Sequence, residues 1–150
     1  MVRVAEAQDA EVVAALLHDF NTEFDTPSPG AAVLAARLRA LLGGASTIAL
    51  LAGDPASGVA LVTLRPNVWY DGPVALLDEL YVVPERRGEG IGSEMIELFM
   101  AECRARGVEL IEINVDESDV DAQRFYRRHG FSDIDPDSGE RSSYFLQELK

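Results

Sequence analysis

The sequence has 150 residues, enough for one domain with a hydrophobic core, and 47% of them are hydrophobic. It carries 26 Asp and Glu against 13 Lys and Arg, a formal net charge of −13. This acidity argues against a nucleic-acid partner, because binding a phosphate backbone requires a basic surface. Without an apolar run of membrane-spanning length or a signal-peptide segment at its N-terminus, the sequence predicts a cytoplasmic protein that does not enter membranes.

The first third of the chain predicts a short strand and two helices. Val2–Val4 reads as the strand, and Asp9 can cap a helix whose apolar face continues to Phe20. A polar loop with two prolines, Asn21–Gly30, separates it from a second helix, Ala31–Leu42. Cys103 is the single cysteine, so an internal disulfide is excluded, and no spacing in the sequence predicts a metal site.

The remainder predicts strands first and a strand–helix–strand unit afterwards. The expected elements are strands Thr47–Ala52, Val59–Leu64 and Val74–Val83, a helix Gly92–Arg106, a strand Val108–Val115, a helix Asp119–His129 and a last strand Ser143–Leu149. Ser118 and Asp121 are spaced like a capping box for the last helix. We therefore expect one α/β (α+β) domain over residues 1–150.

A glycine-rich loop, ERRGEGIGSEM at Glu85–Met95, joins the third of these strands to its helix. It lacks the lysine of a P-loop and misplaces the third glycine of a dinucleotide fingerprint. Glycines nevertheless allow backbone N–H groups to turn inward, and the start of a helix favours a pyrophosphate. Arg86 and Arg87 add positive charge. The same residues also suit a tight turn with two solvated arginines, so the loop alone leaves both interpretations open.

A longer segment, LDELYVVPERRGEGIGSEM, resembles the central motif of the GNAT superfamily of acetyl-CoA-dependent N-acetyltransferases. The signature Arg/Gln-x-x-Gly-x-Gly/Ala is matched by Arg87, Gly90 and Gly92. Downstream, DVDAQRFYRRHGF resembles the second signature, Asn-x-x-Ala-x-x-x-Tyr, with Asp119 in place of Asn and with Ala122 and Tyr126 matching; Gly130 and Phe131 match the Gly-Phe that follows. The resemblance covers essentially the whole chain and implies a GNAT-type mixed, mostly antiparallel central sheet flanked by helices.

By this resemblance the cofactor is acetyl-CoA. Main-chain amides of the glycine-rich loop would hold its pyrophosphate, and the strand before the loop would pair with its pantetheine arm like an added strand. The implied coenzyme-binding residues are Leu80, Tyr81, Val82, Arg86, Arg87, Gly88, Glu89, Gly90, Ile91, Gly92, Ser93, Asp119 and Ala122.

Acetyl transfer to an amine needs a proton acceptor, because an alkyl ammonium of pKa about 10.4 is almost fully protonated at neutral pH. Asp78 and Glu79 are the nearest acids on the expected strand, and alternation predicts that only one faces the cleft. The segments LLDELYV and GIGSEM resemble diamine acetyltransferases, which favours Asp78 as the base, directly or through a water; other branches use the position matched by Glu79. Tyr126 is the implied proton donor to the departing thiolate, whereas without the motif it would be interpreted as packing beside Phe125.

The sequence says least about the amine that would accept the acetyl group. Glu23 and Asp25 could bind a second ammonium group, and Trp69 and Tyr70 could form an aromatic wall; a solvated loop and rim would use the same residues. The acidity and the diamine acetyltransferase resemblance favour a small, cationic, polyamine-like amine, although Arg65 would oppose it if it faced the pocket. A peptide N-terminal or lysine acetyltransferase and a non-catalytic acyl-CoA sensor remain alternatives. The superfamily also implies a homodimer.

Overall fold

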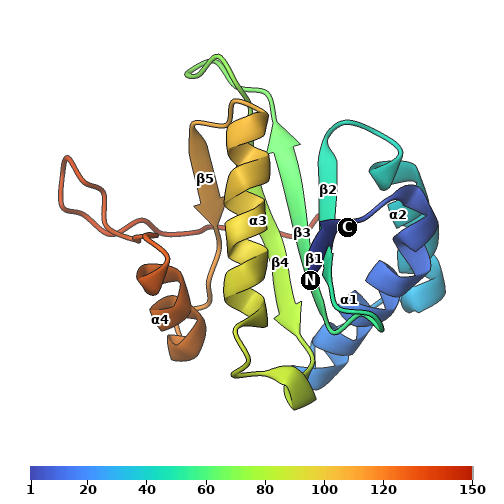
Figure 1. The fold of residues 1–150 in the computed structure, drawn as a ribbon. Coiled ribbons are helices and arrows are strands. Elements are labelled where there is room, and N and C mark those ends of the chain that lie inside the picture. Colours follow the sequence, from blue (N-terminus) through green and yellow to red (C-terminus); the bar gives the residue numbers. More distant parts are fainter. Residues whose placement is uncertain (150) are drawn as a thin grey trace. The chain divides into compact units, whose positions relative to one another are not determined.

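A computed structural model describes residues 1–149 and divides into two compact units, Met1–Ile113 and a second that begins at Asn114. The first unit contains, in order, β1 (Val2–Val4), η1 (Ala7–Asp9), α1 (Ala10–Glu23), α2 (Ala31–Leu42), β2 (Thr47–Ala52), β3 (Gly58–Arg65), β4 (Val74–Val82), η2 (Pro84–Arg86), α3 (Ile91–Ala105) and β5 (Leu110–Ile113) (Figure 1). The second contains α4 (Val120–Arg128). Within residues 1–149, no helix is both long and apolar enough to cross a membrane.

The five strands form one sheet in the order β1-β2-β3-β4-β5. Every neighbouring pair is antiparallel except β4 and β5, which are parallel because α3 crosses over between them. The mostly antiparallel sheet predicted from the sequence is therefore confirmed. β5 is shorter than the predicted Val108–Val115, since only four of its residues pair with β4.

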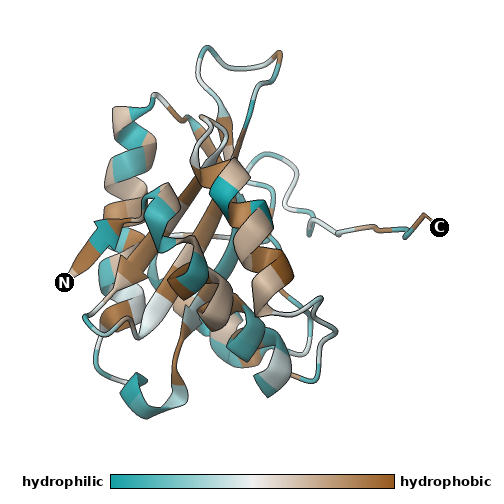
Figure 2. Ribbon diagram, turned by 90° about the vertical axis from the view of Figure 1, so that its right-hand side faces the viewer, coloured by the Kyte–Doolittle hydropathy of each residue, from teal (hydrophilic) through white to brown (hydrophobic). Residues whose placement is uncertain are grey.

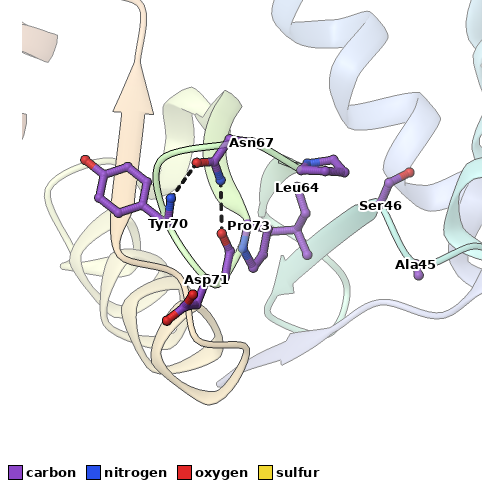
Figure 3. Close-up of a pocket in the computed structure, with 9 residues that line it drawn as sticks. Ala45, Ser46, Leu64, Asn67, Tyr70, Asp71 and Pro73 are labelled. Atoms are coloured by element: carbon purple, nitrogen blue, oxygen red, sulfur yellow. Dashed lines mark hydrogen bonds between the residues drawn. The ribbon is translucent and has the colours of Figure 1, made fainter.

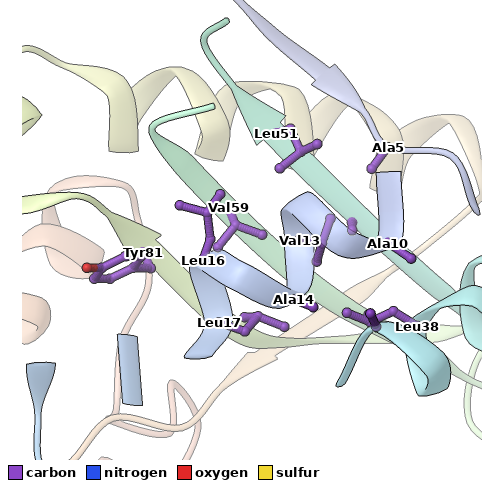
Figure 4. Packing of buried hydrophobic residues seen from close by; sticks show 12 residues of the cluster. Ala5, Ala10, Val13, Ala14, Leu16, Leu17, Leu38, Leu51, Val59 and Tyr81 are labelled. Carbon is purple, nitrogen blue, oxygen red and sulfur yellow. The ribbon is translucent and has the colours of Figure 1, made fainter. Parts of the chain in front are cut away.

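One face of the sheet is covered by α1 and α2. Apolar residues at helical spacing on α1, among them Val13 and Leu17, pack with Leu38 of α2 against Leu51 and Val59 of the sheet (Figure 4). α1 continues one turn beyond the predicted end at Phe20 and stops at Glu23. The end of α1 lies at the C-terminal part of β4: Phe20 stacks on Tyr81 with ring centroids 4.8 Å apart, and Glu23, in the additional turn, accepts a hydrogen bond from the Tyr81 hydroxyl.

The opposite face is covered by α3, which buries Met95, Phe99 and Cys103. Contact with the strands is close: a Cβ added to Gly58 of β3 would lie 2.9 Å from the terminal methyl carbon of Met95. In Figure 2 the strands are largely at the hydrophobic end of the scale, while the helices alternate between hydrophobic and hydrophilic residues. The sheet is thus buried between helices at its centre.

The second unit differs from the sequence predictions in two respects. Asp119, not Ser118, is the N-cap of α4, because its carboxylate accepts a hydrogen bond from the Ala122 N–H at 3.0 Å. The predicted strand Ser143–Leu149 is wrong: within the described residues no backbone ladder pairs with this segment. The bridge formed in this region joins Ile134 and Arg141 around a turn.

A close backbone contact fixes the β3–β4 connection to the end of α3. A Cβ added to Gly72 would lie 1.9 Å from the Gly107 carbonyl oxygen. We predict that Gly72→Ala lowers the free energy of unfolding by about 2 kcal/mol or more, because backbone atoms must move. Gly43→Ala is the matched control, since its Cβ would make only ordinary contacts of 3.5 Å and longer. Equal midpoints of the two variants in urea denaturation would contradict the prediction.

Candidate functional site

The edge of β4 is paired for only half of its length. β5 pairs with β4 from Val74↔Leu110 to Leu77↔Ile113 and no further. On the other side, β3 accompanies β4 to Val82. Within the part of the chain that the structure describes, residues 78–82 of β4 consequently have a strand neighbour on one side and an open edge on the other. An open edge with unpaired backbone groups can accept an amide-bearing ligand as an added strand.

The direction of the backbone groups shows which residues offer them to the open edge. The Val83 N–H donates to Ser57 O, so Val83 is directed toward β3. Alternate residues of an antiparallel strand direct both backbone polar groups to the same side, which places Tyr81 toward β3 as well. Leu80 and Val82 are then the residues directed to the open edge. Of the predicted trio, Tyr81 therefore does not offer its backbone groups to the open edge, and its side chain is buried in the core.

A β-bulge lies at the start of this open segment. Leu61 pairs with Glu79 but Val62 pairs with Leu77, so β4 carries one additional residue, Asp78. Because of this additional residue, the β4 side chains beyond the bulge face the opposite sides of the sheet from those that simple alternation along the strand predicts. The Asp78 carboxylate accepts a hydrogen bond from the Thr63 hydroxyl of β3, with 2.6 Å between the oxygens.

Both carboxyl groups at the bulge are harder to ionise than usual. Partial burial raises the pKa of Asp78, and the hydrogen bond from Thr63 opposes that rise. Burial also raises the pKa of Glu79, and the neighbouring charge of Asp78 adds to it. Desolvation is the main cause in both cases. A carboxylate with a raised pKa is a stronger base than an ordinary surface carboxylate, which suits removal of a proton from an ammonium group.

After β4 the chain makes a sharp turn into α3. Gly88 and Gly90 adopt φ values of +82° and +84°, and within residues 1–149 a Cβ built at either position would have no neighbouring atom within 4 Å beyond the adjoining backbone. Gly90 is the N-cap of α3, and because glycine has no side chain it cannot cap the amides of the first turn. This turn offers glycines with open space beside them and a helix N-terminus that begins at a glycine N-cap, which together fit an anionic group such as a pyrophosphate.

Both arginines of the loop are engaged by carboxylates. Arg86 donates through Nε to both oxygens of Glu89, at 3.1 and 2.9 Å. Arg87 forms a two-point ion pair with Glu23 at the end of α1, and its Nε donates to Val82 O at 3.0 Å. The local positive charge is therefore largely balanced, and the helix N-terminus and backbone amides are left as the main anion-binding elements.

The four predicted acceptor residues do not gather at one place. Glu23 contacts Tyr81 near the C-terminal end of β4, and Asp25 follows in the turn after α1 with a φ of +53°. Trp69 and Tyr70 lie in the connection before the N-terminal end of β4. At about 3.3 Å per residue, these ends are separated by roughly 26 Å.

Trp69 and Tyr70 belong to a loop organised by Asn67. Its side-chain oxygen accepts the N–H groups of both residues, at 2.8 and 2.9 Å, and its amide nitrogen donates to Gly72 O. Beside the loop is a pocket of about 410 Å³ that Tyr70 lines together with Asp71 (Figure 3). Trp69 does not line it, and is 84% exposed.

The second signature lies in the second unit. Asp119 and Ala122 form the first turn of α4 through the cap already described, so Asp119 supports the helix as an Asn would. The ring of Tyr126 contacts Phe125 and Phe131 edge-on, with centroids 5.4 and 6.0 Å away. These ring contacts agree with the packing interpretation of Tyr126 and leave its predicted catalytic role untested.

Sequence reasoning did not identify Thr63, nor the Glu23–Arg87 ion pair. Thr63 is one of several polar residues at an ordinary strand position, and its contact with Asp78 depends on the register of β3 against β4 and on the bulge. Glu23 and Arg87 are 64 residues apart in the chain. No local pattern signals either contact.

Comparisons with curated proteins give partial matches. Over 55 residues the chain is 40% identical to the aminoalkylphosphonate N-acetyltransferase of Salmonella typhimurium, covering 37% of this chain and 36% of that protein. Over 65 residues it is 38% identical to the mycothiol acetyltransferase of Thermobispora bispora, covering 41% and 21%. The matched segments thus span about a third or less of these relatives.

Solved structures match over nearly the full chain. A crystal structure from Arthrobacter sp. FB24, assigned as an acetyltransferase, is 50% identical with a TM-score of 0.93, covering 99% of this chain and 96% of that one. An aminoglycoside acetyltransferase from an uncultured soil sample shares the fold, with a TM-score of 0.81 at 19% identity and coverage of 100% and 96%. The model of the acetyltransferase (GNAT) family matches residues 11–131, and the chain therefore belongs to this family.

Proposed function

We propose that this protein transfers the acetyl group of acetyl-CoA to the primary amine of a small molecule, by direct attack within a ternary complex. The observation that carries the proposal is that three features follow one another along the chain within the first unit: the carboxylates at the bulge, the open edge of β4 and the glycine N-cap at the start of α3. Membership of the acetyltransferase family supports the same reaction.

The coenzyme site follows from the backbone of β4 and the glycine turn. Leu80 and Val82 would bind the pantetheine amides, and the amides from Gly88 to Ser93 would bind the pyrophosphate. When bound, acetyl-CoA supplies a thioester that an amine can attack. Asp119 and Ala122 are proposed near the pantetheine arm on the strength of the second signature alone.

Three side chains are assigned to proton transfer, and a backbone N–H is assigned to stabilise the reacting carbonyl oxygen. Asp78 takes the proton from the incoming ammonium, directly or through one water, with Glu79 as the alternative base. An open-edge N–H, that of Leu80 or Val82, stabilises the charge that develops on the carbonyl oxygen. Tyr126 donates a proton to the sulfur that leaves; this role comes from the motif match.

The acceptor is proposed as a small molecule because the curated relatives are named for small amines and thiols, an aminoalkylphosphonate and mycothiol. A cationic, polyamine-like acceptor remains the more specific proposal; the net charge of −13 supports it, and no relative named above is a polyamine acetyltransferase. Arg65, the residue that would oppose it, forms an ion pair with Glu112 of β5 at 2.5 Å. The cytoplasmic location and the homodimer stay predictions.

Thiol release from acetyl-CoA tests the reaction itself. The protein is incubated with acetyl-CoA and separate panels of polyamines, aminoalkylphosphonates, aminoglycosides, amino acids and peptides. Release that depends on one class of small amine supports the proposal and names the acceptor. Release with peptides alone would indicate a peptide acetyltransferase, and coenzyme binding without release from any acceptor would indicate a sensor.

Tyr126→Phe isolates the proposed proton donor. We predict at least about a tenfold lower kcat, because the phenol is removed while the ring that contacts Phe125 is kept. Coenzyme affinity, measured by calorimetry, should change little. An unchanged kcat would remove Tyr126 from the mechanism and leave it as a packing residue.

The pH dependence of Thr63→Val tests whether Asp78 is the base. The Thr63 hydroxyl stabilises ionised Asp78, so removing it while the burial remains raises the pKa of Asp78 further. A base must be ionised to act, and the acid limb of the kcat/KM profile should therefore move to higher pH. If the acid limb of the profile did not move, Glu79 would be favoured as the base.

The glycine turn is tested by coenzyme binding to Gly90→Ala. A methyl group there would enter the open space at the turn, so we predict weaker coenzyme A binding by about tenfold. Gly107→Ala is the matched control at the other end of α3: it also has positive φ and an open Cβ position, and each variant should cost about 1 kcal/mol of stability. Equal dissociation constants for the two variants would contradict the placement.

A further inference from the structure

Glu23, the last residue of α1, accepts two hydrogen bonds and makes a further ion-pair contact with residues of the candidate coenzyme site. Both arms of the Arg87 guanidinium pair with its carboxylate, each at 2.8 Å. The Tyr81 hydroxyl donates to the same carboxylate at 3.0 Å. The pKa of Glu23 is lowered, chiefly by the hydrogen bond from Arg87, so the group is ionised at neutral pH. Two-point pairing of this kind fixes the plane of the guanidinium as well as its position.

Tyr81 provides the rigid support for this contact. Its side chain is 5% exposed and is stacked on Phe20 of α1. The Arg87 guanidinium carbon lies 5.6 Å from the centre of the Tyr81 ring, within the range of a cation–π contact. Glu23, Tyr81 and Arg87 therefore hold one another through hydrogen bonds and ring contacts, and each comes from a different part of the chain.

The third point of attachment lies on the open edge of β4. Arg87 Nε donates to Val82 O, which is directed to that edge. Of the backbone groups on the edge near the glycine turn, this carbonyl is thus already bonded, and the N–H groups of Val82 and Leu80 are left for a ligand. Arg87 immediately precedes Gly88. Its side chain is held through Nε by Val82 O and through its two terminal nitrogens by Glu23, and this also fixes where the glycine turn begins.

We propose that Glu23 is a positioning residue for the coenzyme: it holds Arg87 so that the glycine turn and the open edge of β4 are aligned before the coenzyme binds. The inference rests on the coenzyme site proposed above. It gives Glu23 a role in holding the coenzyme site, in place of the acceptor-binding role expected from the sequence.

Electrostatics and positioning predict opposite signs for the same substitution. Glu23→Gln removes a negative charge near an anionic ligand, so if the charge alone mattered, coenzyme A should bind more tightly. If Glu23 acts by holding Arg87, the variant loses the two-point pair and coenzyme A should bind more weakly. The direction of the change is therefore diagnostic.

The experiment measures coenzyme A binding by calorimetry for the wild-type protein, Glu23→Gln, Arg87→Lys and the double variant. Arg87→Lys keeps the charge but cannot bond both Glu23 and Val82 O. We expect each single variant to weaken binding about fivefold or more, and the double variant to be no weaker than the worse single variant. Glu11→Gln is the matched control on the same helix, since it breaks the exposed Arg39–Glu11 pair and should leave affinity unchanged.

Three results would overturn the inference while the proposed function stood: tighter binding by Glu23→Gln, unchanged coenzyme affinity with a lower melting temperature, or unchanged coenzyme affinity with a higher KM for the acceptor. Additive losses in the double variant would also contradict it, because residues that act through one contact should not add. If the wild-type protein did not bind coenzyme A, the proposed function itself would fail. The two failures are thus distinguishable.

Discussion

β4 loses its β5 neighbour after Leu77, so within residues 1–149 no strand pairs with its edge at Leu80 and Val82, where Val82 O accepts from Arg87 Nε. An unpaired edge inside a folded sheet is costly unless something satisfies it, and a ligand with amide groups can do so. The bulge at Asp78 lies where that edge begins, and the glycine turn follows where it ends. A single strand therefore sets the spacing between the proposed base and the proposed phosphate site.

The helices make this arrangement rigid from both faces. α3 is anchored by Met95 and Phe99 on one face, so its N-terminus stays next to the glycine turn. On the other face the last turn of α1 reaches Tyr81 and Arg87 through Glu23. The glycine turn is thus supported from both faces of the sheet. Its backbone amides are oriented by contacts with α1 and α3 as well as by the turn itself. Such support is what an anion site built from backbone groups requires.

The sequence predicted the helices and most strands because their patterns are local: alternation in β5, helical spacing in α1, and glycines beside α3. It also placed the glycine turn correctly between β4 and α3. The bulge at Asp78, its hydrogen bond to Thr63 and the Glu23–Arg87 pair depend on register and on contacts between distant segments, which no local pattern contains. The predicted strand Ser143–Leu149 failed for the same reason, since a strand exists only with a partner.

The central claim is that the open edge of β4 and the glycine turn bind the coenzyme as one continuous surface. A crystal structure of the protein with coenzyme A tests it most directly. The account predicts pantetheine amides bonded to the backbone of Leu80 and Val82, and phosphate oxygens within hydrogen-bonding distance of the amides between Gly88 and Ser93. A coenzyme bound elsewhere, or phosphates held by side chains while these amides bond within the protein, would contradict it.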